Sequence, residues 1–452
     1  MQLNRAAFGE DFHWGVSTAA YQIEGAHDAD GKGPSIWDDF TGRKKKIYSS
    51  HHGNTACNFY NLYRNDISLM NHMHIPNYRF SIAWSRIFPE GTGRVSQAGV
   101  DYYNSLINEC LKKGIQPWIT LYHWDLPQAL EQKGGWTNRE ILGWFEIYVT
   151  FCVQQFGDRV QRWMILNEPM VFTGAGYFLG VHAPGKKSLN RFLAAVHHAA
   201  LCQAAGGRIV KSLKQDAIVG TTFSYSHIEP WRNNETDLAA AKKTDTLLNR
   251  LFIEPLLGNG YPVRELKILN RLEKFYKDGD ESKLAFDMDF FGLQNYTREI
   301  VRHAPFMPFI KARIIKAEKR NVDCTQMKWE VHPPAIYYAL MRWNHYDNLK
   351  EIIVTENGAA FDDCCIDGKI EDFKRINYLK DHIAQVQRAK KAGCPVNGYF
   401  VWTFLDNFEW AEGYYPKFGL VHVNFETQER IIKDSGKWYA AFLNGNISAD
   451  IP

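Results

Sequence analysis

Two glutamates stand where apolar runs typical of buried strands come to an end. Glu168 lies in Ile165–Pro169 and Glu356 in Val354–Gly358, and each has an asparagine beside it. Either glutamate alone is equally consistent with a helix cap or an ion pair. Together they match what glycosidic cleavage requires, because the leaving oxygen needs a proton and the developing oxocarbenium ion needs a nucleophile or a base. One of the two must then have its pKa raised by burial and by its neighbour, so that it can donate a proton at neutral pH.

Other polar and aromatic residues follow further candidate strands. Amide, imidazole and carboxylate groups offer the paired donors and acceptors that sugar hydroxyls need, and an indole face can stack on the apolar side of a pyranose. Each tryptophan alone is more often a core residue, so the indication comes from the set. Its members are Gln22, Arg79, His123, Trp124, Tyr296, Trp402, Glu409 and Trp410.

Eight strand-like runs alternate with stretches of helical periodicity, among them 101–113, 138–156, 192–213 and 375–392. Such alternation favours a parallel sheet whose faces are covered by helices. Eight units favour a closed (β/α)₈ TIM barrel of the α/β class, with an open doubly wound sheet as the alternative. In a barrel the carboxyl ends of all strands meet at one rim, which would bring the residues above together. The predicted strands are 12–22, 77–84, 116–123, 162–168, 218–226, 289–296, 351–356 and 396–404.

No composition shift or linker divides the chain, so we expect one domain over residues 1–452 with long βα loops. The longest loop, about 298–330, is expected to overhang the mouth of the barrel. Its apolar segment, Pro305–Ile310, suggests that apolar leaving groups are accepted there.

Composition excludes several classes of partner. The 53 basic and 50 acidic residues leave a formal charge of +3, too small an excess to predict nucleic-acid binding. No apolar run reaches about 18 residues, and residues 1–10 lack a signal-like core, so we expect no membrane partner and a cytoplasmic location. The phosphate-loop-like Gly180–Lys186 lacks the following Ser or Thr, and the histidines lack zinc-ligand spacing, so we expect no cofactor and no metal. The sequence is also compatible with a homo-oligomer.

Several segments resemble motifs of glycoside hydrolase family 1, the β-glucosidases, in the family's order and over essentially the whole chain. They are Phe12–Gly25, Tyr78–Trp84, Tyr122–Pro127, Asn167–Pro169, Thr355–Gly358 and Asp406–Trp410.

The resemblance implies a retaining barrel enzyme with Glu168 as acid/base and Glu356 as nucleophile, their carboxyl groups ~5–5.5 Å apart. It also implies that Arg79 and Tyr296 hold the nucleophile as an oriented anion and that Trp329 forms an aromatic wall for the leaving group. The implied substrate-binding residues are Gln22, His123, Trp124, Asn167, Gln294, Trp329, Trp402, Glu409, Trp410 and Phe418.

Positions at which this sequence differs from the motifs of particular subgroups of the family limit the classes of substrate that we expect. Phospho-glycosidases carry Ser, Lys and Tyr where this chain has Glu409, Pro416 and Phe418, so the resemblance implies small unphosphorylated β-glucosides or oligosaccharides. Plant thioglucosidases have Gln in place of Glu168. The segment Gln294–Thr297 stands where Asn-Tyr-Tyr-Thr is usual, and its Gln is longer than Asn by one methylene. Two alternatives stay open, a catalytically silent sugar-binding barrel and an enzyme that mainly transfers glycosyl groups.

Overall fold

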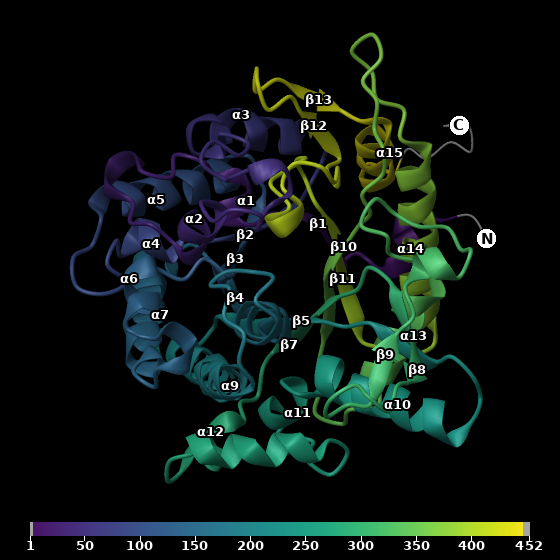
Figure 1. The fold of residues 1–452 in the computed structure, drawn as a ribbon. Helices are drawn as coiled ribbons and strands as arrows, with labels where there is room; N and C mark the ends of the chain where they lie inside the picture. Colours follow the sequence, from purple (N-terminus) through teal and green to yellow (C-terminus); the bar gives the residue numbers. More distant parts are fainter. Residues whose placement is uncertain (1–2, 446–452) are drawn as a thin grey trace.

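The computed structural model describes residues 3–445 and contains a closed barrel of eight parallel strands (Figure 1). The order of strands around the barrel is β1-β11-β10-β7-β5-β4-β3-β2. The predicted barrel is confirmed, and the open doubly wound alternative is wrong because β1 pairs with both β2 and β11. The barrel strands are β1 (His13–Ser17), β2 (Asn77–Ser81), β3 (Gln116–Tyr122), β4 (Arg162–Asn167), β5 (Ile218–Ser224), β7 (Phe290–Gln294), β10 (Ile352–Asn357) and β11 (Val396–Trp402).

Helices surround the barrel in Figure 1 and bury the outer faces of its strands. Their starts follow local chemistry: the Ser188 side chain accepts a hydrogen bond from Arg191 N at the start of α9, and Pro169 takes the first position of α8. The helices are α1 (Ala20–Ile23), α2 (Ile36–Thr41), α3 (Phe59–His72), α4 (Trp84–Ile87), α5 (Gln97–Lys112), α6 (Gln128–Gln132), α7 (Ile141–Phe156), α8 (Pro169–Thr173), α9 (Leu189–Leu213), α10 (Glu235–Asp245), α11 (Ile253–Leu256), α12 (Asp280–Leu284), α13 (Pro334–Trp343), α14 (Phe373–Lys391) and α15 (Asp434–Leu443).

Several predicted strands extend too far at their carboxyl ends. Gln22 lies in α1 and Trp84 begins α4, although both were included in predicted strands. The apolar pattern continues past the last ladder bond because these rim residues are also buried, and burial alone does not distinguish a strand from the turn of helix that follows it.

Two small sheets lie outside the barrel. The strands β6 (His227–Pro230), β8 (Arg298–His303) and β9 (Ala312–Ile314) form one of them, and β12 (Val421–Val423) pairs with β13 (Arg430–Ile432) in the other. The long segment after β7 therefore contributes β8 and β9 as ordered strands. Within the described residues, no helix is both long and apolar enough to cross a membrane.

The barrel interior has an apolar layer below a polar one. Side chains from five strands form a separate buried cluster, made of Trp118, Met164, Phe290, Ile353 and Phe400. Above it, the Arg79 Nε donates to Thr120 Oγ1 at 3.1 Å and to Met164 Sδ at 3.2 Å. The apolar layer closes the bottom of the barrel, so the polar groups are open only toward the carboxyl ends of the strands.

The two strands that lead to the glutamates each contain one extra residue. In β4 the register against β5 shifts between Met164 and Asn167, and in β10 the register against β7 shifts between Val354 and Glu356. A strict alternation would place residues three apart on opposite faces. Because of the bulge, Ile353 packs in the interior cluster and Glu356 also faces the interior.

We expect truncation of the apolar layer to destabilise the protein. Phe400 is fully buried, with its ring centroid 4.8 Å from that of Trp118. Phe400→Ala should lower the free energy of unfolding by about 3–5 kcal/mol, through lost burial and a cavity, measurable by urea denaturation. The matched control is Phe306→Ala, whose side chain is 98% exposed and should change stability by less than about 0.5 kcal/mol. Equal effects of the two substitutions would contradict this layered interior.

Candidate active site

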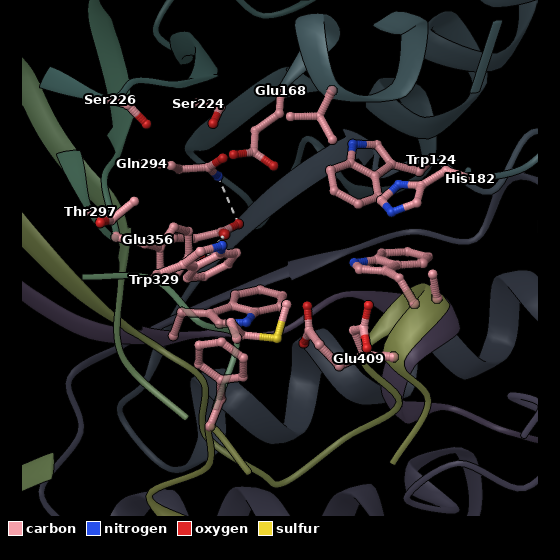
Figure 2. Close-up of a pocket in the computed structure, with 18 of the residues that line it drawn as sticks. Trp124, Glu168, His182, Ser224, Ser226, Gln294, Thr297, Trp329, Glu356 and Glu409 are labelled. Atoms are coloured by element: carbon pink, nitrogen blue, oxygen red, sulfur yellow. Dashed lines mark hydrogen bonds between the residues drawn. The ribbon is translucent and has the colours of Figure 1, made fainter. Parts of the chain in front are cut away.

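A cavity of about 300 Å³ opens at the carboxyl ends of the barrel strands. Figure 2 shows Glu168, Gln294 and Glu356 facing this cavity, with Trp124 and His182 on another side of it. The lining residues are His123, Trp124, Glu168, Val171, His182, Ser224, Tyr225, Ser226, Gln294, Tyr296, Thr297, Glu299, Met327, Trp329, Glu356, Trp402, Glu409, Trp410, Ala411, Glu412 and Phe418.

Glu356 is the last residue but one of β10, and hydrogen-bond donors surround its carboxyl group. Its Oε1 accepts from the Arg79 guanidinium and from Gln294 Nε2, the latter at 2.7 Å, and its Oε2 accepts from the Tyr296 hydroxyl at 2.6 Å. Burial raises the pKa of this carboxyl, whereas Arg79 and the Tyr296 hydrogen bond lower it. All three donors stabilise the carboxylate form and fix its orientation.

The amide of Asn167 connects the two catalytic strands. Its Oδ1 accepts from Arg79 Nη2 at 2.5 Å and from Gln294 Nε2 at 2.7 Å. Its Nδ2 lies 3.0 Å from the His123 Nε2 and 3.5 Å from Glu168 Oε2. Because Arg79 bonds both Asn167 and Glu356, one buried guanidinium sets the relative position of β4 and β10.

Glu168 has a different environment from Glu356. It follows β4 with a backbone φ of 44°, and it caps α8. Burial is the largest cause that raises its pKa well above the usual range, and the negative charge of Glu356 raises it further, while Ser224 and Arg79 act in the opposite direction. Among the described residues, the long contact from Asn167 is the only hydrogen bond that an amide donates to the Glu168 carboxyl group. The proton therefore favours Glu168, and the negative charge favours Glu356.

One end of the cavity is polar and rimmed by indoles. The Gln22 Nε2 donates to Phe408 O at 2.9 Å and to Glu409 Oε2 at 3.2 Å, which orients the Glu409 carboxyl. Burial raises the pKa of Glu409 to about 8, and Glu356 contributes to the rise. The Trp124 and Trp410 rings pack with centroids 4.6 Å apart. This end offers hydroxyl-binding groups together with flat apolar faces.

The other end has an aromatic wall. The Trp329 ring lies 5.2 Å from Tyr296 and 6.2 Å from Phe418, centroid to centroid, and Met327 lines the cavity beside them. Ser224, Ser226 and Thr297 line the cavity as well, and Figure 2 shows these three apart from Trp124 and His182.

The structure brings the sequence-predicted residues together. Those that line the cavity are His123, Trp124, Glu168, Gln294, Tyr296, Trp329, Glu356, Trp402, Glu409, Trp410 and Phe418. Gln22, Arg79 and Asn167 are fully buried and lie outside the lining, where they bond to residues that belong to it.

Other lining residues were missed by the sequence interpretation. Ser224 and Ser226 end the fifth predicted strand, so their position at the rim was a usable signal. His182 lies within the phosphate-loop-like segment that was set aside, and Glu299 carries no motif. The expected role of Pro305–Ile310 is wrong, because none of these residues lines the cavity and Phe306 points into solvent.

Gln294 and Asn295, at the end of β7 where the sequence departs from the family motif, have different hydrogen-bond partners. The longer Gln294 side chain still reaches both Glu356 and Asn167. Asn295 Nδ2 instead donates to the backbone oxygens of Tyr225 and Thr297, at 2.8 and 3.0 Å, and so fixes the local chain. Within the described chain, no group of three or more His, Cys, Asp or Glu side chains is placed to hold a metal ion.

The family model described as glycosyl hydrolase family 1 matches residues 4–447. This chain belongs to glycosyl hydrolase family 1. The family 1 chain is 43% identical to beta-glucosidase A of Thermotoga maritima over 98% of its own length and 99% of the relative's. It is 41% identical to beta-glucosidase A of Acetivibrio thermocellus, with 98% and 100% covered.

Solved structures agree with this assignment. A beta-glucosidase from Thermotoga maritima in complex with deoxynojirimycin matches the family 1 chain with a TM-score of 0.92 and 41% identity, covering 97% of this chain and 98% of that one. The AHE enzyme from Alicyclobacillus herbarius matches with a TM-score of 0.93 and 37% identity, covering 98% and 99%. The family 1 chain is therefore a glycoside hydrolase in fold and in sequence.

Proposed function

We propose that this chain is a retaining β-glucosidase that hydrolyses terminal, non-reducing, unphosphorylated β-D-glucosyl residues. The observation that carries the proposal is the contrast between the two carboxyl groups. Glu356 accepts from three donors that stabilise its anion, whereas burial and the charge of Glu356 favour the proton on Glu168. Such a pair can supply a nucleophile and an acid at the same pH. The beta-glucosidase names of the relatives support the choice of glucose.

In the first step, an oxygen of Glu356 attacks the anomeric carbon while the bond from that carbon to the leaving oxygen breaks. The proton of Glu168 moves to the leaving oxygen, so the leaving group departs as a neutral alcohol. Arg79, Gln294 and Tyr296 hold Glu356 before the attack. Because their orientation is set in advance, little reorganisation is needed during the reaction.

In the second step, Glu168 takes a proton from water as the water oxygen attacks the anomeric carbon. The bond to Glu356 breaks, its carboxylate is restored, and Glu168 is again protonated. Two inversions give net retention at the anomeric carbon. An added alcohol that replaces water in this step would give the transglycosylation alternative, and product analysis with such an acceptor measures its share.

The polar end of the cavity is proposed to hold the glucosyl ring. Glu409, oriented by Gln22, can accept from two neighbouring hydroxyls, and His123 with Asn167 provides a second polar edge. Trp402 supplies a flat face, with its ring 5.9 Å from that of His123. Glu409 would repel a phosphate when it is ionised, and no lysine or arginine stands among the described lining residues to bind one, which favours unphosphorylated sugars.

The test is incubation with a 2-deoxy-2-fluoro-β-glucoside that bears a good leaving group, followed by intact mass and peptide mapping. We expect a single glycosyl adduct on Glu356, because fluorine slows both steps and the good leaving group restores the rate of the first step alone, so that the glycosyl-enzyme accumulates. An adduct on another residue would contradict the assignment. If no adduct forms but a galactoside is turned over, the preferred sugar is galactose and not glucose. If no glycoside is turned over, the catalytically silent sugar-binding barrel is favoured.

A further inference from the structure

The carboxyl group of Glu299 lies in the cavity but has no function in the proposed mechanism. Glu299 lies on β8, is half-buried, and lines the cavity together with Thr297. Arg298, between them, points elsewhere, because its guanidinium donates to Glu229 and Glu330. Within residues 3–445, no hydrogen bond or ion pair reaches the Glu299 carboxyl. No partner among the described residues therefore offsets the partial burial of this carboxyl group.

The nearby cations are engaged by another carboxylate. Arg298 donates to Glu330 at 2.8 and 2.9 Å, and Arg320 donates to it at 2.7 Å. Burial raises the pKa of Glu299 to about 7, which Arg320 opposes and Glu330 reinforces. A cation from outside the chain would relieve this unfavourable burial.

The described lining of the cavity contains acidic side chains and no permanently basic ones. Five glutamates line it, namely Glu168, Glu299, Glu356, Glu409 and Glu412, and among its described lining residues there is no lysine or arginine. Burial lowers the pKa of the lining His123 and His182, so these rings are neutral near pH 7. The indole of Trp329 and the ring of Phe418 border the leaving-group end, and aromatic faces attract cations.

We propose that the leaving-group end of the cavity is a binding site for a positively charged aglycone, an ammonium group in particular, with Glu299 as its counter-ion and Trp329 as its aromatic face. This inference rests on the proposed β-glucosidase function, since the glucosyl ring anchors the ligand. A carboxylate and an aromatic face that line the same cavity can recognise an ammonium group through charge and through the ring quadrupole together. The preferred substrates would then be β-glucosides of amine-bearing alcohols or phenols.

The experiment compares the binding of two thioglucosides, which resist hydrolysis, by calorimetry at about pH 8. One is 4-(ammoniomethyl)phenyl 1-thio-β-D-glucoside, and the other is its 4-(hydroxymethyl) analogue of nearly the same size. We expect the ammonium ligand to have a Kd about tenfold lower in the unmodified protein. Glu299→Gln should remove most of this ratio while leaving the Kd of the hydroxymethyl ligand unchanged within about twofold. Raising the salt concentration should reduce the ratio.

The matched control is Glu318→Gln, which makes the same change in net charge at an ion-paired residue outside the cavity lining. It should keep the tenfold ratio. Equal binding of the two ligands to the unmodified protein, or a preference that survives Glu299→Gln, overturns the inference. Hydrolysis of 4-(hydroxymethyl)phenyl β-D-glucoside, assayed separately, reports on the proposed function, so the two can fail independently.

Discussion

Glu356→Ala is expected to lower kcat for 4-nitrophenyl β-D-glucoside by on the order of 10⁴- to 10⁶-fold, as removal of a catalytic nucleophile does in other enzymes. The substitution removes the oxygen that attacks the anomeric carbon and leaves Arg79, Gln294 and Tyr296 without their common acceptor. Release of 4-nitrophenol measures the loss. Circular dichroism and the thermal midpoint must accompany it, because an unpaired buried Arg79 also lowers stability.

Rescue separates chemistry from folding in this variant. Azide can enter the space left by the carboxylate and attack from the same face, giving α-glucosyl azide with an inverted anomeric centre. A folded Glu356→Ala protein that neither loses turnover nor forms this azide would contradict the nucleophile assignment. Glu318→Ala, an exposed carboxylate outside the cavity, serves as the control and should retain full turnover.

Glu168→Gln should have an effect that depends on the leaving group. With cellobiose, whose leaving oxygen needs a proton, we expect kcat/KM to fall by about 10²- to 10⁴-fold. With 2,4-dinitrophenyl β-D-glucoside the first step needs no proton, so kcat/KM should change little and the covalent intermediate should accumulate. Added azide should then release β-glucosyl azide, whose anomeric centre is opposite to that formed by Glu356→Ala. A uniform loss on both substrates would contradict the role of Glu168 as acid.

The pH profile provides a second test of Glu168. Its folded-state pKa is raised, and it acts in the first step while protonated, so turnover is full below that pKa and declines as the pH rises through it. The unmodified protein should show this alkaline decline of kcat/KM on cellobiose, and because glutamine does not titrate, the residual kcat/KM of Glu168→Gln on cellobiose should lack it. Persistence of the decline would assign it to another group.

The strands and the rim could be predicted from the sequence because their causes are local. Buried parallel strands give apolar runs such as 352–354, and the polar residue that ends each run must lie at the shared rim. Glu168, Glu356, His123 and Tyr296 were found in this way. Where a run continued into buried rim residues, as at Gln22, the same signal placed the strand end too late.

Contacts that depend on side-chain reach could not be predicted from the sequence. Whether Gln294 would bond Glu356 depends on a difference of one methylene against a backbone position fixed by the whole barrel. Glu299 belongs to no sequence motif. Its carboxyl group lacks a partner among the described residues because Arg298 and Arg320 donate their hydrogen bonds to Glu330. The segment Pro305–Ile310 is apolar, but its predicted position beside the leaving group is wrong. The sequence pattern does not determine the direction in which a hairpin projects from the barrel.

The extra residues in β4 and β10 make strand length part of the catalytic apparatus. If the bulge were straightened with the same residues in place, regular alternation would put Ile353 and Glu356 on opposite faces and turn the carboxylate outward, toward the surrounding helices. Such a chain could keep every signature motif of a hydrolase and still be inert. Transfer of this active site to an idealised barrel must therefore copy the irregular spacing along with the residues, and a homologue that lacks the spacing should be suspected of having lost the reaction.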